Sequence, residues 1–216
     1  MALINDITIN EHSSIRIADR FCIYVDPFMI RQNAHDADLI LITHPHYDHY
    51  SPNDIKKVSK DGTLMIAPDS MRVEMYRVSS NVHFMQPGDE HETLGISIKA
   101  VSSYNARKEN HLKAAGWLGY VMTIGKTRVY VSGDMDKCDE AEEGFCDIAM
   151  VPIGGTYTFD YKGAAKFVNK IKPKIVVPTH YGTIVGEYGD ADKFAELVDK
   201  GIKVVIKVPK KEPEMF

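Results

Sequence analysis

The stretch LITHPHYDHY places His44, His46, Asp48 and His49 within six positions of a chain that has nine histidines in all. Neutral imidazole nitrogens and carboxylate oxygens are ligands that Zn²⁺, Mn²⁺ and Fe²⁺ accept in proteins. His44 and His46 are two residues apart, so both side chains can project to the same side of an extended or tightly turned backbone. Asp48 and His49 follow after the chain turns and could serve a second ion. The stretch predicts a metal site, with a histidine-rich polar loop as the alternative.

The segments on either side of this stretch predict how it is held. The apolar run ADLILIT at residues 37–43 directly precedes the first histidine and is typical of a buried strand. A strand end suits metal ligands, because the sheet fixes their positions while the following loop can wrap around an ion. Ser51 and Pro52 then open PNDIKKVSK, which predicts a helix with a capping serine and a first-turn proline.

The remaining elements change in kind along the chain. Strands are expected in the first half at residues 13–18, 21–27, 63–68, 81–85, 96–101, 117–124 and 127–134, with a helix at 70–79 after Asp69 as its cap. In the second half, strands at 146–155, 174–180 and 202–208 alternate with helices at 160–171 and 191–201, with Asp160 and Asp190 as N-caps and Gly201 at a helix end. Strands that dominate early and helices that interleave later indicate a mixed fold whose sheets are covered by helices.

Length and composition narrow the class of protein. The 216 residues are 44% hydrophobic and 26% charged, which is typical of one globular domain covering residues 1–216. The net charge of −4 gives no support for a non-specific nucleic-acid or membrane surface. Three cysteines without a CxxC pair indicate a reducing compartment, and neither a secretory signal nor a membrane-spanning run is visible. We therefore expect a cytoplasmic protein whose partner is a small-molecule substrate, and the oligomeric state stays open.

The motifs also carry a resemblance to a known family. HxHxDH at the end of a strand is the motif of the metallo-β-lactamase-fold hydrolases. IYVDPF with Asp26 resembles their early Asp-Pro element, VYVSGDMD with Asp134 their Gly-Asp motif, and VVPTHYG with His180 their late ligand histidine. These elements follow the family's order across nearly the whole chain. The resemblance decides between the two readings of the histidine cluster in favour of metal.

A narrower resemblance points to the stand-alone metal-dependent hydrolases that include the ascorbate-6-phosphate lactonase-like proteins. NEHSSIRI with His12 is similar to their N-terminal Gly-His-Ser/Ala element, although Glu11 stands where they carry glycine. The segment SYNARKENHLKAAGWLGYV is similar to the one that precedes their Gly-Asp motif.

The resemblance implies a centre of two divalent ions, with zinc expected and manganese or iron accepted by the same ligand types. It implies one ion held by His44, His46 and His111, another by Asp48, His49 and His180, and Asp134 as the bridge. The third histidine of the first ion is open to two readings, because the strand before it ends near Asn105, where no histidine stands. In one reading His111 reaches back from a loop to the first ion. In the other, water or Asn105 completes the set of ligands around that ion.

The same resemblance implies an α+β fold, a four-layer α/β/β/α sandwich with the site at one edge. A metal-bridged hydroxide would attack a small polar ester, lactone or phosphoester. Asp48 and His49 are the expected catalytic residues, with Asp48 orienting the nucleophile and passing a proton to the leaving group. The residues expected to contact substrate or support the ligands are His12, Asp26, Tyr104, Asn105, Asp136 and Tyr181.

Three other functions compete with a small-molecule hydrolase. An iron-dependent redox or oxygen-handling protein on the same fold usually has glutamate at the position of His46 and carries an added flavin domain. Nucleic-acid phosphodiesterases of the family insert a large domain between the Gly-Asp motif and the late histidine, whereas only 45 residues separate Asp134 from His180 here. The nearly complete ligand set argues against a non-catalytic binding module.

Overall fold

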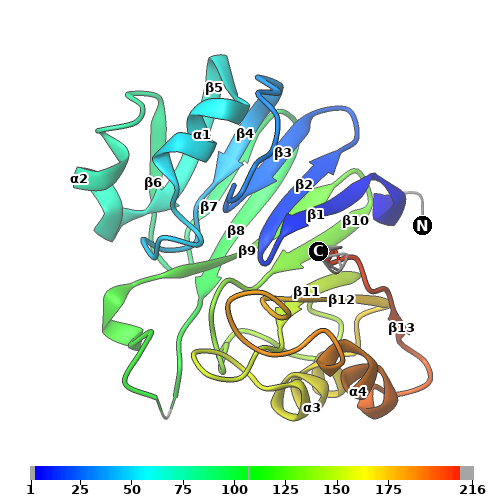
Figure 1. Cartoon of the computed structure of the whole chain (residues 1–216). Helices are drawn as coiled ribbons and strands as arrows, with labels where there is room; N and C mark the ends of the chain where they lie inside the picture. Colours follow the sequence, from blue (N-terminus) through cyan, green and yellow to red (C-terminus); the bar gives the residue numbers. More distant parts are fainter. Residues whose placement is uncertain (1–2, 107, 210–216) are drawn as a thin grey trace, which may run out of the picture.

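The computed structural model describes residues 3–106 and 108–209, and the strands in these ranges form two mixed sheets (Figure 1). The first sheet contains β1 (Ile7–Glu11), β2 (Ser14–Ala18), β3 (Cys22–Val25), β4 (Ala37–Leu41), β5 (Ser59–Pro68) and β6 (Val82–Met85), in that spatial order. The second contains β7 (Glu90–Thr93), β8 (Ile96–Ser102), β9 (Leu118–Ile124), β10 (Thr127–Val131), β11 (Ile148–Pro152), β12 (Ile175–Thr179) and β13 (Lys203–Val204). Its spatial order runs from β13 back to β7.

Each sheet starts with antiparallel hairpins and continues with parallel strands. In the first sheet β1, β2 and β3 are antiparallel and β3 to β6 are parallel. In the second, β7 to β10 are antiparallel and β10 to β13 are parallel. Parallel strands end at the same edge of a sheet. The loops after β3, β4, β10 and β12 therefore leave the two sheets where polar side chains can gather.

Strand β4 shows how the apolar pattern builds the layers. Leu39 and Leu41 belong to the core cluster between the sheets, whereas Ile40 and Ile42 belong to a second cluster on the outer face. All four side chains are fully buried. Successive strand residues point to opposite faces, so a strand covered on both sides needs a continuous apolar run. This is why the run ADLILIT correctly predicts a buried strand at this place in the chain.

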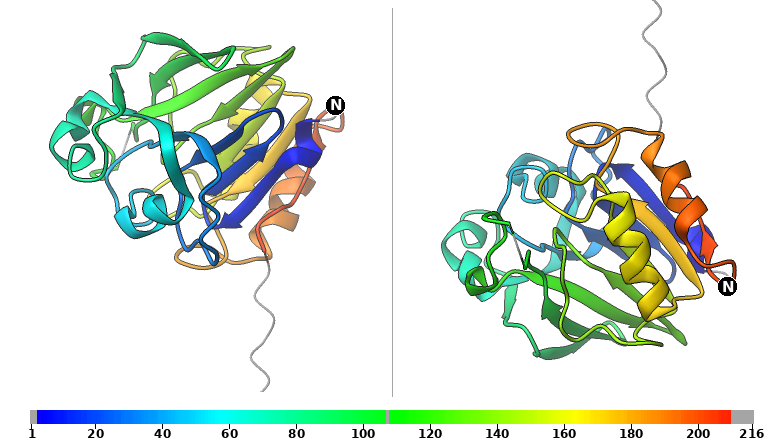
Figure 2. Two further views of the ribbon diagram at one scale, coloured as in Figure 1. Left: turned by 90° about the horizontal axis from the view of Figure 1, so that it is seen from above. Right: turned by 90° about the horizontal axis from the view of Figure 1, so that it is seen from below.

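Helices close the two outer faces. The helices are α1 (Pro52–Val58), α2 (Arg72–Met75), α3 (Tyr161–Ile171) and α4 (Asp190–Leu197), with 3₁₀ turns at Leu3–Asp6, Asp69–Met71 and Lys113–Ala115. Helix α1 lies outside the first sheet, and α3 and α4 lie side by side outside the second (Figures 1 and 2). The buried face of α3 carries Ala164, Ala165, Val168 and Ile171, at helical spacing. These layers make the α/β/β/α sandwich that was expected.

Helix starts confirm two of the expected caps and correct two others. Ser51 caps α1 by accepting the Asp54 N–H, and Asp160 caps α3 by accepting the Gly163 N–H. Asp69 does not cap a helix: it opens a 3₁₀ turn, and its carboxylate binds Arg72. Asp190 is the first residue of α4 rather than its cap, because its carboxylate accepts the N–H of Glu187.

Other boundaries also differ from expectation. The helix expected at 70–79 is reduced to the four residues of α2. The strand expected at 202–208 pairs only at Lys203–Val204, after which the chain turns so that Lys207 donates to the Ile7 carbonyl of β1. Helix α4 ends at Leu197, so Gly201 is not its cap. Strand β1 was missed, although its alternating burial is that of a half-covered strand.

No helix within residues 3–106 and 108–209 is long and apolar enough to cross a lipid bilayer; α3, the longest of those described, has 11 residues.

Asp54 ties α1 to the loop that follows β3. Its carboxylate accepts the backbone N–H groups of Met29 (3.0 Å) and Ile30 (3.2 Å), and the Lys57 ammonium lies 2.7 Å away. Asp54 is only 7% exposed. Burial opposes ionisation of this carboxyl, but the hydrogen bonds from Lys57, Ser51 and Met29 together with the Lys57 charge hold its pKa below the ordinary value. The loop conformation thus depends on an ionised, well-bonded carboxylate.

We expect Asp54→Ala to lower the free energy of unfolding by about 2–4 kcal/mol, because two backbone N–H groups lose their acceptor. Urea denaturation measures this loss. The matched control is Asp69→Ala, which removes an exposed pair with Arg72 and should cost less than about 1 kcal/mol. Equal losses in the two variants would contradict the assigned role of Asp54.

The natural protein should have a higher free energy of unfolding than Asp54→Ala at neutral pH, and this difference should shrink as the pH is lowered. Because the folded pKa of Asp54 is depressed, its contribution is present above the unfolded pKa of about 3.9 and is lost as pH falls through the folded pKa. Denaturation of both proteins between pH 2 and 8 measures the difference. A difference that stays constant down to pH 2 would show that ionisation of Asp54 is not involved.

Candidate metal centre

Imidazoles and carboxylates, all of them buried except the exposed His46, converge at the edge where the parallel strands of both sheets end. They come from the turn after β1, the loop after β4, the loop between β8 and β9, and the segments after β10 and β12. In chain order they are His12, His44, His46, Asp48, His49, His111, Asp134 and His180. Segments that are distant in sequence therefore supply one compact group.

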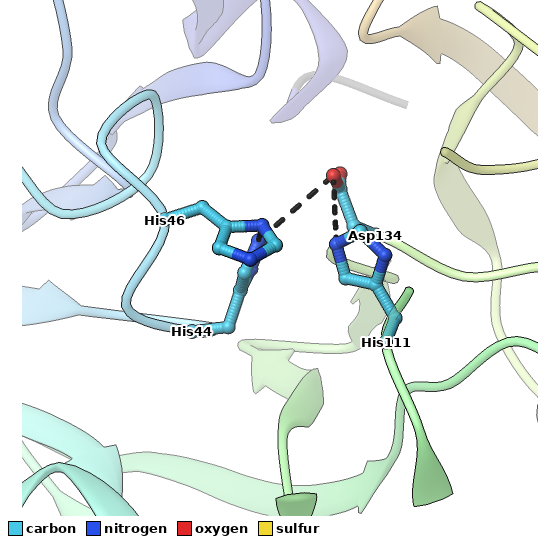
Figure 3. Close-up of side chains that lie close together, drawn as sticks. All are labelled: His44, His46, His111 and Asp134. Atoms are coloured by element: carbon cyan, nitrogen blue, oxygen red, sulfur yellow. Dashed lines mark hydrogen bonds and ion pairs between the residues drawn. The ribbon is translucent and has the colours of Figure 1, made fainter. Parts of the chain in front are cut away.

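The first ligand group consists of His44, His46, His111 and Asp134, whose candidate ligand atoms all lie within 4.8 Å of one another. Figure 3 shows His44 and His46 on one side, facing His111 and Asp134. His111 Nε2 lies 3.3 Å and His44 Nε2 3.9 Å from Asp134 Oδ2. His44 Nε2 also lies 3.1 Å from His46 Nδ1. Three imidazoles and one carboxylate thus surround a common space.

His111 enters this group from a loop, as one of the two expected readings requires. Asn105 lies behind it and holds the loop: its Nδ2 donates to the carbonyl oxygens of Tyr157 (2.6 Å) and Asn110 (2.9 Å). The Asn105 backbone N–H also donates to the His111 carbonyl at 2.8 Å. The geometry places His111, and not Asn105, beside Asp134. Asn105 acts as support for the loop.

Asp134 also lies among a second set of imidazoles. His49 Nε2 is 3.2 Å from Asp134 Oδ1, and His180 Nε2 is 3.0 Å from Asp134 Oδ2. His180 Nε2 is in turn 3.4 Å from Asp48 Oδ2. The groups His49–Asp134–His180 and His12–Asp48–His180 each bring three ligand atoms within 4.8 Å. Asp134 is thus shared between the two sides of the centre, where a bridge was expected.

His12 was expected to support the ligands, yet the structure places it among them. It is fully buried, its Nε2 lies 3.5 Å from Asp48 Oδ2, and its ring centroid is 3.8 Å from that of His180. The backbone N–H of His180 donates to the backbone carbonyl of His12 at 3.2 Å, and this bond joins the segments after β1 and β12. The sequence carried the same signal here as at His44, a histidine directly after a strand. No strand was expected at residues 7–11, so the position of His12 at a strand end could not be recognised from the sequence.

Asp26 holds His49 from behind, as expected. Its Oδ2 lies 2.8 Å from His49 Nδ1, while the carboxylate also accepts the Thr43 N–H (2.7 Å) and the Thr43 hydroxyl (2.6 Å). A carboxylate on Nδ1 fixes the ring orientation and leaves Nε2 free to face the centre. Asp26 is therefore a positioning residue.

Three other side chains expected near the centre lie elsewhere. The Tyr104 hydroxyl donates to Asp139 at 2.8 Å, and Asp136 accepts the Ala106 N–H at 2.6 Å. Tyr181 packs in the main apolar core, where burial raises the pKa of its phenol to about 12. Proximity in sequence to Asn105, Asp134 and His180 was misleading, because neighbouring strand and loop residues point in different directions.

The backbone at the centre is unusually strained. His12, Asp26, His111 and His180 have φ values of 54°, 48°, 60° and 56°. This left-handed region is disfavoured for residues other than glycine, and such conformations cluster at functional sites. Gly154 after β11 adds a close contact, because a Cβ there would lie 2.2 Å from the His180 carbonyl oxygen. Tight packing therefore determines where His180 sits.

Burial and mutual charge set the protonation of the group. Burial lowers the pKa of His44 well below its ordinary value and that of His12 to about 4, so both rings are neutral at neutral pH. Burial opposes ionisation of Asp134, but the charges on His180 and His49 outweigh it and hold the pKa of this carboxyl well below its usual range. Burial opposes protonation of His49 and His180, but the neighbouring carboxylates together raise the pKa of both rings. Because neutral imidazoles and ionised carboxylates are the forms that bind metal, these two rings would release a proton when an ion binds.

Several ligand atoms in the same place make ion-pair contacts of 3.0–3.5 Å but no hydrogen bond, which shows that the residues fit cations. The Nε2 atoms of His12, His49, His111 and His180 and the Oδ1 atom of Asp134 are buried without a hydrogen bond. Each such atom costs about 1–3 kcal/mol when it stays unsatisfied. Divalent ions would use these lone pairs, and the nitrogen and oxygen donors match Zn²⁺, Mn²⁺ and Fe²⁺.

Comparison with known proteins places the chain in a family. Residues 6–180 match the model described as beta-lactamase superfamily domain. The chain is 30% identical over 213 residues to a UPF0173 metal-dependent hydrolase of Thermococcus onnurineus, covering 92% of this chain and 94% of the relative. It is 31% identical over 213 residues to one of Thermoplasma volcanium, covering 93% and 94%. A solved structure from Parabacteroides distasonis superposes with a TM-score of 0.75 and 31% identity, covering 94% of this chain and 93% of that one. The chain therefore belongs to the beta-lactamase superfamily and, within it, to the UPF0173 metal-dependent hydrolase family.

Proposed function

We propose that this metal-dependent hydrolase works with two divalent ions on a small ester, lactone or phosphoester. The observation that carries the proposal is the convergence of two ligand groups on one shared carboxylate, Asp134. The resemblance to ascorbate-6-phosphate lactonase-like proteins supports including lactones among the substrates.

Each ion has its own set of ligands in this proposal. His44, His46 and His111 hold the first ion, Asp48, His49 and His180 hold the second, and Asp134 contributes to both. His12 lies within reach of the second ion as a further ligand, since it groups with Asp48 and His180. Zinc is the proposed ion, and manganese and iron fit the same donors.

The chain's own residues then have distinct tasks. Bound divalent ions would polarise the scissile carbonyl or phosphoryl group and would lower the pKa of a bound water toward ~7. Asp48 lines the hollow in front of the centre, where it accepts a proton from the nucleophile and returns it to the leaving group. His49 keeps its ring fixed against Asp26 and thereby keeps its Nε2 directed at the reacting region.

Metal titration tests the ligand assignment. We expect two equivalents of zinc or manganese per chain for the natural protein, about one for His111→Ala, and less than one for Asp134→Ala, because Asp134 serves both ions. Elemental analysis after gel filtration measures the stoichiometry. The control is His83→Ala, which changes a histidine of β6 outside the centre. Failure of the natural protein to bind metal after titration would refute the proposal.

Asp26→Asn tests the support of His49. We expect binding of the second ion to weaken about 10- to 100-fold, because partners behind a ligand histidine contribute that much to metal affinity. Competition with a chromophoric chelator measures both affinities. The control is Asp36→Asn, which alters a carboxylate bound to Arg16 and Tyr24. Unchanged affinity for both ions in Asp26→Asn would show that this contact is not needed.

Asp48→Asn tests proton transfer. We expect kcat to fall about 10²–10⁴-fold on p-nitrophenyl acetate or a simple lactone, because a positioned acid–base group contributes that much. Elemental analysis of the same samples separates lost proton transfer from lost metal. The control is Asp61→Asn, which changes an exposed carboxylate near the start of β5. Full activity of Asp48→Asn would assign the proton transfer to another group.

A further inference from the structure

A hollow of about 350 Å³ opens directly in front of the centre. This volume lies at the small end of the range for ligand pockets. Members of the two ligand groups form its floor, and Tyr47, Asn110, Tyr157, Ile184 and Val185 form the rest of its lining. A molecule whose reacting bond lies at the centre must place its remaining atoms against these side chains.

Apart from the exposed amide of Asn110, the exposed rim of the hollow is formed by tyrosine and isoleucine side chains. Tyr47 is 66% exposed, Tyr157 43% and Ile184 37%. The three residues come from separate loops, after β4, after β11 and after β12. Single exposed apolar residues are ordinary, but a group of them around a concave catalytic region indicates a binding surface. Here the surface borders the ligand groups of the centre.

The same rim offers no positive charge among the residues that the structure describes. The hollow's described lining contains no lysine or arginine, and its titratable imidazoles and carboxylates all belong to the ligand groups at the floor. Lys108 lies in the loop that carries His111, but its ammonium donates to the Gly155 and Thr158 carbonyls. An anionic group of a substrate, placed away from the centre, would lose its water without gaining a partner.

We infer that the preferred substrates carry an uncharged, apolar alkyl or aryl group beside the scissile ester or lactone bond. This inference rests on the proposed hydrolase function and narrows its substrate class. Substrates with a second anionic group placed against the rim are disfavoured. Apolar contacts with Tyr47, Tyr157 and Ile184 provide the preference, since each buried methylene strengthens binding.

Binding of three hydroxamates to the metal-loaded protein tests the inference without turnover. Acetohydroxamic acid, hexanohydroxamic acid and adipic acid monohydroxamate share the metal-binding head group and differ only in the tail. We expect hexanohydroxamate to bind at least tenfold more tightly than acetohydroxamate and at least tenfold more tightly than the adipic compound, whose tail ends in a carboxylate. Titration calorimetry measures the three dissociation constants.

Rim variants with matched controls locate the effect. Ile184→Ala and Tyr157→Ala should each reduce the preference for the hexanoyl tail at least threefold while leaving acetohydroxamate binding unchanged. Ile206→Ala and Tyr76→Ala, at 42% and 58% exposed positions outside the hollow, should change neither. Ile184→Lys should raise the affinity for the adipic compound relative to hexanohydroxamate, because it places a cation at the rim.

The outcomes distinguish failure of this inference from failure of the proposed hydrolase function. Equal binding of the three tails, tighter binding of the adipic compound, or indifference to all rim variants would overturn the apolar class while leaving the hydrolase proposal in place. Failure of every hydroxamate to bind a protein that holds two equivalents of metal, together with no hydrolysis of any ester or lactone, would overturn both.

Discussion

The structure depends on one buried carboxylate, Asp134, that lies among imidazoles from both sheets. Burial makes an isolated negative charge costly, so the carboxylate is tolerable only because His49, His111 and His180 lie within 3.3 Å of its oxygens. Those histidines are held by separate loops that follow strands of two different sheets. The sandwich must therefore bring two sheet edges into register before this group of charges can form.

Backbone strain at the centre has the same origin. Four of its residues adopt left-handed conformations, which the surrounding structure must over-determine if they are to persist. Hydrogen bonds between segments distant in sequence supply the constraint, such as those from the His180 backbone N–H to the His12 carbonyl and from the Thr43 backbone N–H to the Asp26 carboxylate. Donors held in this way by their surroundings are preorganised for ligand binding.

The division of labour between sheets and loops explains how one fold serves different substrates. Strand ends place the imidazoles and carboxylates, and these determine the type of reaction. The rim residues Tyr47, Tyr157 and Ile184 belong to loops, which can vary without disturbing the layers. Family membership therefore establishes metal-dependent hydrolysis, whereas the apolar rim is the feature of this particular chain that bears on its substrate.

Local sequence was sufficient to predict those features that depend only on residues close together in the chain. The run ADLILIT is buried on both faces and so predicts strand β4, and the ligands after it share one short loop. Asp134 and His180 also directly follow strands, which made them visible. Ser51 and Asp160 cap helices through contacts with residues three positions away, and such short-range rules hold without knowledge of the fold.

Only the tertiary structure decided the features that join distant segments. His111 reaches Asp134 from a loop whose path depends on Asn105 and on the carbonyl of Tyr157, a residue from another loop. His12 enters the centre because β1 pairs with β2 at the edge of its sheet and its end meets the end of β12. No local sequence pattern encodes these contacts between distant segments, because they follow from the packing of two sheets against each other. Sequence by itself determined the kind of chemistry, and packing decided which donors face the ions and what surface the substrate meets.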